Sequence, residues 1–489
     1  MTMRMLYQVN TRVWLRGLSA ALRRRATLDD LPEAELDRLA GLGFDALWCL
    51  GVWETGAAGQ EIARTLPELR REYAAVLPDL TDADVCGSCF AITRYAVHPA
   101  LGGLAALERL RERLHRRGMR LILDFVPNHT ARDHAWVASH PEFYVQGSDE
   151  DLARRPHDYC TEGAGDRRRI LAHGRDPFFP GWTDTLQLNY GNPALQEAMR
   201  GELLKIAEWC DGLRCDMAML LLSNVFQMTW HIPAAPFWPR AIREVRARHP
   251  DFVFLAEVYW DLEWTLQEQG FDYTYDKRLY DRLRQGYGAA VRQHLMAEMA
   301  FQRKLARFLE NHDEPRAASA FPPGMHRAAA VLAFLAPGLV FVHQGQLEGR
   351  KIRVPVQLCR APGEPVDAPL QAFYERLLAC RQHAAIREGE WRLLTPVPAW
   401  DGNPTWNAFV AFAWEGGGGR RLLVTANYGA TQGQCYVRLP FAERGRAVRL
   451  RDQMGTAVYD RSGDELQEKG LYLDLPAWGY HVFEVDHLP

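Results

Sequence analysis

The stretch "FVFLAEV", residues 252–258, is a run of large apolar residues that closes on the acid Glu257 and a valine. Continuous hydrophobicity of this kind is typical of a strand that is buried on both faces of a parallel sheet. An acid at the end of such a strand is unusual, because an unpaired carboxylate in the interior costs several kcal/mol. The stretch therefore predicts a buried parallel sheet whose strands carry polar groups to one edge.

Further apolar runs resemble this one and alternate with helical patterns, for example at 104–118 and 236–250. Strands separated by helices are the signature of parallel βα units. Together with 252–258 the runs make eight, which predicts an α/β fold of the (β/α)8 TIM-barrel type. The other expected strands are residues 6–15, 44–50, 120–126, 212–218, 271–276, 305–311 and 339–345.

Two regions do not fit a minimal barrel. Residues 127–192 are rich in Gly, Pro, Asp, Arg and His and exceed an ordinary loop, so they predict a small inserted domain, domain B, after the third strand. Residues 390–489 carry short alternating runs and predict a C-terminal antiparallel β-sandwich domain. The catalytic barrel would then comprise residues 1–126 and 193–389.

Composition excludes several partner classes. The 489 residues hold 58 Lys and Arg against 61 Asp and Glu, and this balance gives no reason to expect a nucleic acid or an anionic membrane as partner. The N-terminus lacks the apolar stretch of a signal peptide, and no run of about 18 apolar residues occurs. We therefore expect a soluble, cytoplasmic protein with no membrane partner.

The nine cysteines show no regular spacing, which favours reduced thiols over a disulfide framework. The one CxxC pair, Cys86 and Cys89, has no second pair to complete a zinc site. We interpret these cysteines as structural.

Polar residues gather where four of the expected strands end. In a parallel barrel these ends meet at one mouth, where the loops carry the chemistry, so we expect the side chains to converge. The residues are Asp124, Asn128 and His129 at the end of the third strand, Arg214 and Asp216 in the fourth, Glu257 in the fifth, and His312 and Asp313 after the seventh.

Carboxylates beside an arginine and histidines suit the cleavage of a glycosidic bond, which needs one ionised acid to attack and one protonated acid to release the leaving oxygen. Asp216 is the candidate for the ionised acid because Arg214 lies two residues away, on the same side of the strand. Glu257 is the candidate for the protonated acid, since its sequence neighbours are apolar. Asp313 and the histidines would bind sugar hydroxyls.

The motifs "DFVPNH", "GLRCD", "AE" of "FLAEV" and "NHD" resemble, in order, the four main motifs of glycoside hydrolase family 13, the α-amylase family. The resemblance covers roughly the first four-fifths of the chain. It implies a retaining double displacement on α-glucosidic bonds. Asp216 would be the nucleophile, Glu257 the acid/base and Asp313 the third acid. It also places Asp124, His129, Arg214 and His312 on substrate-binding positions, and Phe90 where the family often has a tyrosine platform.

Departures from the family pattern narrow the expected substrate. Many starch-cleaving members have Lys-His where this chain has Met219 and Leu220, so we expect a short α-glucoside or small oligosaccharide rather than a long glucan. Gln187 stands where an aspartate often helps to bind calcium, so we expect no metal and no other cofactor.

Residues 173–190 would form a wall of the substrate pocket. An alternative is that this segment only packs domain B on the barrel. The side chains that could contact the leaving group or an acceptor are His173, Arg175, Asp176 and Trp182.

Several functions stay open at this point. Hydrolases, α-glucan transglycosylases and glucoside isomerases of the trehalose synthase type share one covalent intermediate and differ in what attacks it second. A metal-dependent barrel enzyme and a non-catalytic carbohydrate-binding protein are the alternatives from other classes. The oligomeric state is left open.

Overall fold

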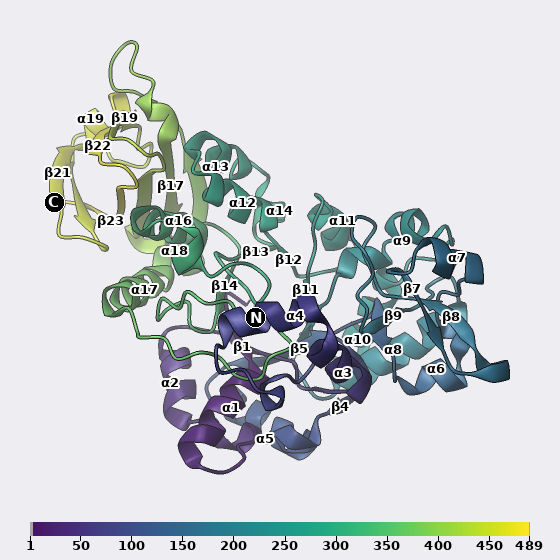
Figure 1. Ribbon diagram of the computed structural model, residues 1–489. Helices are drawn as coiled ribbons and strands as arrows, with labels where there is room; N and C mark the ends of the chain where they lie inside the picture. Colours follow the sequence, from purple (N-terminus) through teal and green to yellow (C-terminus); the bar gives the residue numbers. More distant parts are fainter. Residues whose placement is uncertain (1–2, 489) are drawn as a thin grey trace. The chain divides into compact units, whose positions relative to one another are not determined.

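The computed structural model describes residues 3–488 (Figure 1). Its central feature is a closed barrel of parallel strands in the order β1-β14-β13-β12-β11-β10-β5-β2. All eight strands overlap the expected ones, so the barrel prediction is confirmed. Their bounds are β1 Met5–Asn10, β2 Ala46–Leu50, β5 Arg120–Phe125, β10 Gly212–Cys215, β11 Val253–Ala256, β12 Tyr273–Tyr275, β13 Leu305–Arg307 and β14 Leu339–His343.

The first strand is shorter than expected. The prediction of a strand over 6–15 was wrong from residue 11, because α1 (Thr11–Leu22) begins there. Asn10 starts this helix: its side-chain oxygen accepts a hydrogen bond from Val13 N at 3.2 Å, which supplies one of the unpaired first-turn amides with a partner.

Helices precede or follow the barrel strands along the chain. The two helices expected from periodicity are confirmed as α5 (Gly103–His115) and α10 (Trp238–Arg248). In α5 the apolar residues recur at helical spacing, and Ala106, Leu110 and Leu114 are buried. Others are α8 Pro193–Ala207, α9 Ser223–Trp230, α12 Lys277–Gln285, α16 Pro323–Leu335 and α17 Ala368–Arg381.

β10 lies close to both of its neighbours in the barrel. It pairs in parallel with β5 on one side and with β11 on the other. At Gly212, its first residue, a Cβ atom would come within 2.7 Å of Val253 O and 2.8 Å of Ile122 Cδ1. A glycine is needed at this close approach.

The inserted region forms small sheets of its own. β6 (His129–Ala131) pairs antiparallel with β9 (Thr185–Gln187), and β7 (Tyr159–Glu162) pairs antiparallel with β8 (Arg169–Ala172) (Figure 1). The first pairing sets His129 opposite Gln187, so the two ends of the insertion meet directly after β5.

The C-terminal region contains two antiparallel sheets, with the orders β15-β17-β18-β23-β20-β21 and β16-β19-β22. Residues of both sheets, such as Phe409, Leu423 and Leu473, share one hydrophobic core, as in a β-sandwich. The predicted C-terminal antiparallel domain is confirmed. The strands are β15 Glu390–Leu394, β16 Pro396–Pro398, β17 Phe409–Glu415, β18 Arg421–Asn427, β19 Gly433–Val437, β20 Ala447–Asp452, β21 Val458–Ser462, β22 Leu471–Leu475 and β23 Tyr480–His487.

By packing, the chain divides into two compact units. The first comprises residues up to Ala40, Phe44–Tyr275 and Arg353–Gly363, and the second comprises Gly41–Gly43, Asp276–Ile352 and residues from Glu364 onward. This division does not test the domain boundaries expected from the sequence, which stay a prediction. Within residues 3–488, none of the helices has the length and apolar character that crossing a bilayer requires.

Candidate active site

Two of the predicted acids, Asp216 and Glu257, directly follow neighbouring parallel strands. Asp216 comes after β10 and Glu257 after β11. Asp216 N donates to Phe125 O at 2.8 Å, and Glu257 N donates to Cys215 O at 3.1 Å, so both acids continue the backbone ladder of the barrel. The strand ends therefore hold the two backbones in fixed register.

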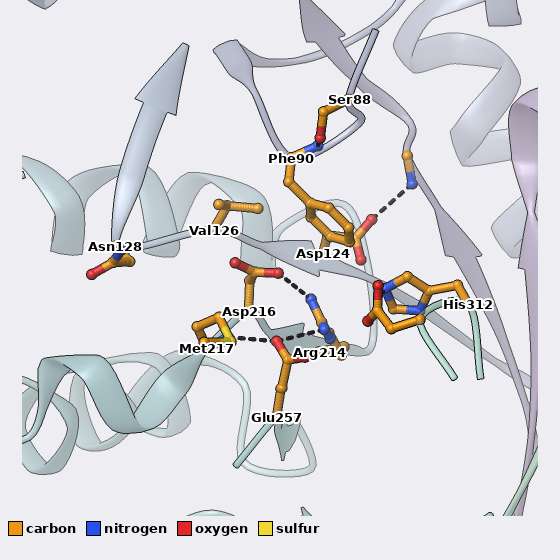
Figure 2. Close-up of polar contacts among 12 residues, drawn as sticks. Ser88, Phe90, Asp124, Val126, Asn128, Arg214, Asp216, Met217, Glu257 and His312 are labelled. Atoms are coloured by element: carbon orange, nitrogen blue, oxygen red, sulfur yellow. Dashed lines mark hydrogen bonds and ion pairs between the residues drawn. The ribbon is translucent and has the colours of Figure 1, made fainter. Parts of the chain in front are cut away.

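Arg214 joins the two acids (Figure 2). Its Nη1 lies 2.5 Å from Asp216 Oδ1 and its Nη2 lies 2.6 Å from Glu257 Oε2. Burial by itself would lower the pKa of this fully buried guanidinium, but the charges of Glu257 and its other acidic neighbours raise it well above the ordinary value. Arg214 is therefore a permanent positive charge between two buried carboxyl groups.

The surroundings of Glu257 differ from those expected. The sequence predicted an apolar setting, and this was wrong at the carboxyl group: besides Arg214, Oε2 accepts a hydrogen bond from Met217 N at 2.7 Å, and Oε1 accepts one from Tyr259 OH at 2.9 Å. The apolar neighbours Phe254 and Leu255 are buried in β11, but they do not set the environment of the acid.

A sharp turn after Asp216 supplies one of these contacts. Met217 adopts left-handed backbone angles, with φ of 43°, and Ala218 N then donates to Glu257 O at 3.0 Å. α10 supports the turn, since Trp238 Nε1 donates to Ala218 O at 2.9 Å. Strained backbone of this kind is found mostly at functional sites, where the surrounding structure fixes it.

Asp124, the last acid of β5, is held by two donors. Trp48 Nε1 donates to its Oδ1 at 2.9 Å, and Gly51 N donates to its Oδ2 at 2.8 Å. Gly51 has a φ of 80°, and a Cβ atom there would lie 2.8 Å from Cys89 Cβ, so glycine is required for this contact. Asp124 is 1% exposed, and its carboxylate is fixed in place.

Two neutral amides, those of Asn128 and Gln187, bind each other after the end of β5. Gln187 Nε2 lies 3.0 Å from each of three oxygens, Asn128 O, Asn128 Oδ1 and Leu188 O. Asn128 Nδ2 in turn donates to Gln187 Oε1 at 3.2 Å. The amide of Gln187 thus places a donor among the oxygens that surround it.

His129 directly follows Asn128, and its Nδ1 lies 3.4 Å from Asn128 Nδ2. Its ring packs against Trp182 with centroids 5.2 Å apart. Burial lowers the pKa of His129 to about 3, so the imidazole is neutral at physiological pH. It can share hydrogen bonds with a neutral sugar without adding charge.

Phe90 covers Arg214 on another side. Its ring centroid lies 5.2 Å from the guanidinium carbon, and the Trp48 centroid lies 5.4 Å from it. Aromatic rings over a cation are attractive by about 0.5–2 kcal/mol. Phe90 is half-buried.

His312 and Asp313 follow β13 in the second unit. His312 Nε2 lies 2.9 Å from Asp313 Oδ2, and Asn311 Oδ1 accepts hydrogen bonds from Asp313 N and Glu314 N. The Asp313 side chain is 48% exposed, unlike the buried Asp216. Their approach to Asp216 stays a prediction.

The segment 173–190 divides into buried and exposed side chains. Of the four expected contact residues, His173 and Asp176 are buried, and Arg175 and Trp182 are half-buried. His173 Nδ1 lies 2.8 Å from Thr185 O, and Asp176 Oδ1 accepts hydrogen bonds from Phe178 N and Phe179 N. Arg175 lies over the ring of Trp230. His173 and Asp176 bind within their own loop, and Arg175 packs on α9, which fits the alternative that this part of the segment packs domain B on the barrel.

The exposed members of this region were missed by the sequence analysis. Phe178 and Phe179 are 63% and 66% exposed, and the Phe178 ring meets Trp260 edge to face at 4.9 Å. Trp260 follows Tyr259, the donor to Glu257, and it adopts a left-handed φ of 64°. The aromatic pair in "EVYWD" was the available signal. We call Phe178, Phe179 and Trp260 the aromatic shelf.

Comparison with known families agrees with this geometry. The model of the α-amylase catalytic domain matches residues 33–354. Alpha-amylase 3 of Dictyoglomus thermophilum is 24% identical over 295 residues, which are 56% of this chain and 56% of that protein. An α-1,4-glucan:maltose-1-phosphate maltosyltransferase of Burkholderia pseudomallei is 30% identical over 268 residues, which are 53% of this chain and 20% of that protein. The chain thus spans about half the length of the first relative and about a fifth of the length of the second.

Solved structures with the same architecture include a maltogenic α-amylase from Thermotoga neapolitana, with a TM-score of 0.70 and 18% identity over 98% of each chain. A trehalose-6-phosphate hydrolase from Bacillus licheniformis has a TM-score of 0.65 and 15% identity over 99% of each chain. These likenesses show the fold. Since the matched residues 33–354 also contain the strand ends that carry Asp124, Asp216 and Glu257, the chain belongs to the α-amylase family, glycoside hydrolase family 13.

Proposed function

We propose that this protein is a retaining α-glycosidase that acts on short α-glucosides or maltooligosaccharides. The observation that carries the proposal is the single guanidinium of Arg214, which contacts both Asp216 and Glu257. Because one planar group touches both acids, their nearest oxygens lie within roughly 7 Å, a range that includes the separation of about 5–5.5 Å typical of retaining glycosidases.

In the first step Asp216 attacks the anomeric carbon and forms an ester with the sugar, while the leaving oxygen takes a proton from Glu257. Arg214 favours the ionised form of its partner, which keeps Asp216 nucleophilic. In the second step Glu257 takes a proton from water, and the resulting oxygen nucleophile breaks the ester. The two inversions restore the original configuration at the anomeric carbon.

Arg214 also explains how Glu257 can act as an acid and then as a base. In the free enzyme its charge is shared between two carboxyl groups. Once Asp216 is esterified and neutral, the guanidinium acts on Glu257 alone and favours its ionised form. The change in charge on Asp216 is thus coupled to the change in role of Glu257.

Other side chains would position the sugar. Asp124, fixed by Trp48 and Gly51, presents a rigid acceptor to sugar hydroxyls. In a parallel barrel the residues after every strand lie at one end, so we expect His312 and Asp313, after β13, to reach the same sugar. The neutral His129 would complete this binding site.

The aromatic shelf supports a short oligosaccharide substrate. Exposed aromatic rings beside an acid/base provide an apolar face for a second sugar ring on the leaving-group side. Met219 and Leu220 are buried and offer no polar contact to a longer glucan. The shelf also favours a second candidate, transfer to a sugar acceptor by an α-glucan transglycosylase or glucoside isomerase, since an acceptor held there would compete with water.

Two functions from other classes fit less well. In a metal-dependent barrel enzyme a cation would lie between Asp216 and Glu257, but Arg214 occupies that place. A non-catalytic sugar-binding protein would not need two buried acids beside one guanidinium. Turnover of an aryl α-glucoside in excess EDTA distinguishes all three: a metal enzyme stops, and a binding protein never turns over.

The mechanism is tested by following the first-formed sugar by NMR with an aryl α-glucoside. Retention gives the α-anomer first, and a β-anomer would overturn the proposal. Asp216→Asn should lower turnover by roughly 10⁴-fold or more. The matched control is Asp211→Asn, before the start of β10, where the acid pairs with Arg111 and His115 and turnover should remain.

Product analysis separates hydrolysis from transfer. With maltose and maltotriose, hydrolysis yields shorter sugars only, whereas longer oligomers or a rearranged disaccharide identify transfer. Trp260→Ala should shift the ratio toward products of water attack and raise KM for maltotriose. Trp400→Ala, which removes another exposed tryptophan, in the second unit, serves as the control.

A further inference from the structure

A cavity of about 440 Å³ lies in the first unit, and its lining residues do not include the acids described above. Its lining includes the thiols Cys86 and Cys359 and the guanidinium groups of Arg12, Arg16 and Arg25. This volume lies within the range of about 300–1,000 Å³ that is usual for small-molecule sites. Among the described residues that line it, none is an aspartate or glutamate.

Backbone pairing brings the two cysteines together. Val85 and Leu358 form an antiparallel bridge, Cys86 N donates to Gln357 O at 2.8 Å, and Cys359 N donates to Asp84 O at 2.9 Å. Cys359 is opposite Asp84, and Cys86 is two residues further along that strand. The two thiols are hydrogen-bonded to each other, and both line the same cavity.

An ion pair beside the bridge fixes this arrangement. Arg360, which follows Cys359, has its Nε 2.7 Å from Asp84 Oδ1. Asp84 is 1% exposed, so this pair is largely shielded from solvent. The loop that carries Cys359 is therefore held against the segment that carries Cys86.

Arg12 distinguishes the two sulfurs. Its Nη1 lies 3.4 Å from Cys86 Sγ, and its other contacts are neutral oxygens, Gly87 O and Thr55 Oγ1. The Cys359 thiol and the Arg12 charge lower the pKa of Cys86 to about 6, whereas contact with Cys86 raises the pKa of Cys359. Cys86 is thus the more readily ionised thiol of the pair, and the thiolate is the nucleophile in disulfide exchange.

We propose that Cys86 and Cys359 form a thiol–disulfide exchange site that reacts with small anionic disulfides. The partner of Cys86 in this site is Cys359, not Cys89 of the CxxC pair. Arg16 and Arg25 are exposed at the cavity and leave it with a positive field, which concentrates anions near Cys86.

The exchange proceeds in two steps. The Cys86 thiolate attacks one sulfur of the disulfide, the sulfur–sulfur bond breaks, and one small thiolate leaves with the electron pair. Cys359 then loses its proton and attacks Cys86 Sγ, which forms the Cys86–Cys359 bond and releases the second small thiol. Two protein thiols are oxidised and one disulfide is reduced to two thiols. The product would tie residues 353–363 to the segment leading to Phe90.

The chain offers an internal control. Cys160 is half-buried like Cys86, but burial raises its pKa to about 12. Treatment of the full chain with oxidised glutathione, followed by peptide mapping under non-reducing conditions, should give a Cys86–Cys359 cross-link in the wild type and no adduct on Cys160. An adduct on Cys160 at an equal rate, or the absence of the cross-link, overturns the proposal.

Single variants separate the two steps. Cys359→Ser should retain one glutathionyl group on Cys86, because no second thiol displaces it. Cys86→Ser should give neither adduct nor cross-link. If Cys86→Ser still gains glutathione at Cys359, the assignment of the nucleophile is wrong.

Charge selection is tested with a pair of reagents of opposite sign. Arg16→Ala combined with Arg25→Ala should slow the reaction with glutathione disulfide by about tenfold and leave the reaction with the cationic disulfide cystamine unslowed. Both arginines are exposed, so the variant should fold. Equal slowing with both reagents would contradict an anion-selective cavity.

Discussion

Two polar clusters follow neighbouring barrel strands, and they are built in opposite ways. The charged centre, Arg214 with Asp216 and Glu257, follows β10 and β11 and holds its acids by ion pairs of 2.5 and 2.6 Å. The amide centre, Asn128 and Gln187 with His129, follows β5 and uses neutral hydrogen bonds of 3.0 to 3.2 Å. Both clusters are buried, so their difference in charge is not a matter of solvent access.

The comparison indicates a role for the buried charges of Arg214 and its two acids. A buried ion pair rarely stabilises a fold more than apolar residues of the same volume would, so stability alone does not explain Arg214 between two acids. The proposed cleavage of a glycosidic bond, which develops charge, would explain it. The amide centre follows β5, beside β10, and it buries no charge. A neutral centre of this kind suits the proposed binding of a neutral sugar.

Removing the guanidinium should break the charged centre most severely. Arg214→Met leaves two buried carboxyl groups without their cation, and we expect the free energy of unfolding to fall by about 3–5 kcal/mol. Urea unfolding measures the loss. Adding Asp216→Asn and Glu257→Gln to this variant should restore part of the stability, because the two carboxyl groups that had lost their cation are then neutral. A loss below about 1 kcal/mol for Arg214→Met would show that the pairs add little.

The equivalent change in the amide centre should have a smaller effect. Gln187→Met removes the donor to Asn128 and Leu188 without removing a charge, so we expect a loss of about 1–3 kcal/mol. Gln60→Met is the matched control, since its amide makes one hydrogen bond, to Val85 O, in a partly buried position. If Gln187→Met cost as much as Arg214→Met, charge would not be the difference between the centres.

Acid should weaken the amide centre through His129. Its folded pKa of about 3 lies below the ordinary value of 6.5, so the unfolded chain takes up the proton first. The stability from the neutral ring is complete above pH 6.5. It falls by about 1.4 kcal/mol per pH unit as the pH drops from 6.5 toward 3. Urea unfolding at several pH values should show a shallower slope in His129→Asn than in the wild type, and equal slopes would contradict this assignment.

The sequence predicted the acids of the charged centre and the closeness of Arg214 to Asp216, but not the contacts of Glu257. The run 252–258 marks a buried strand, and its end places Glu257 correctly at the end of β11. The contact of Arg214 with Glu257 depends on the register of β10 against β11, which no residue pattern within one strand specifies. The apolar neighbours of Glu257 therefore gave the wrong environment for its carboxyl group.

Loops and helix starts are the other parts of the structure that the sequence did not predict. The helix at Thr11 follows an asparagine cap that the apolar run 6–15 concealed, and Asn10 was the available signal. The aromatic shelf forms because Phe178 and Trp260, from two separate loops, come into contact. No spacing of residues within the sequence indicates a contact of this kind. The barrel was predictable because its strands are short apolar runs that alternate regularly with longer helical patterns.

The smallest expected effect is that of calcium removal on the amide centre. Gln187 Nε2 is within 3.0 Å of Asn128 O, Asn128 Oδ1 and Leu188 O, and a donor among these oxygens takes the place that a cation would need. We therefore expect EDTA to leave the wild-type Tm unchanged. Gln187→Asp replaces the donor with a carboxylate and should make the Tm rise with added calcium, whereas the neutral Gln187→Asn should not respond. A fall of several degrees in wild-type Tm on chelation would mean that a cation, and not the amide, holds this centre together.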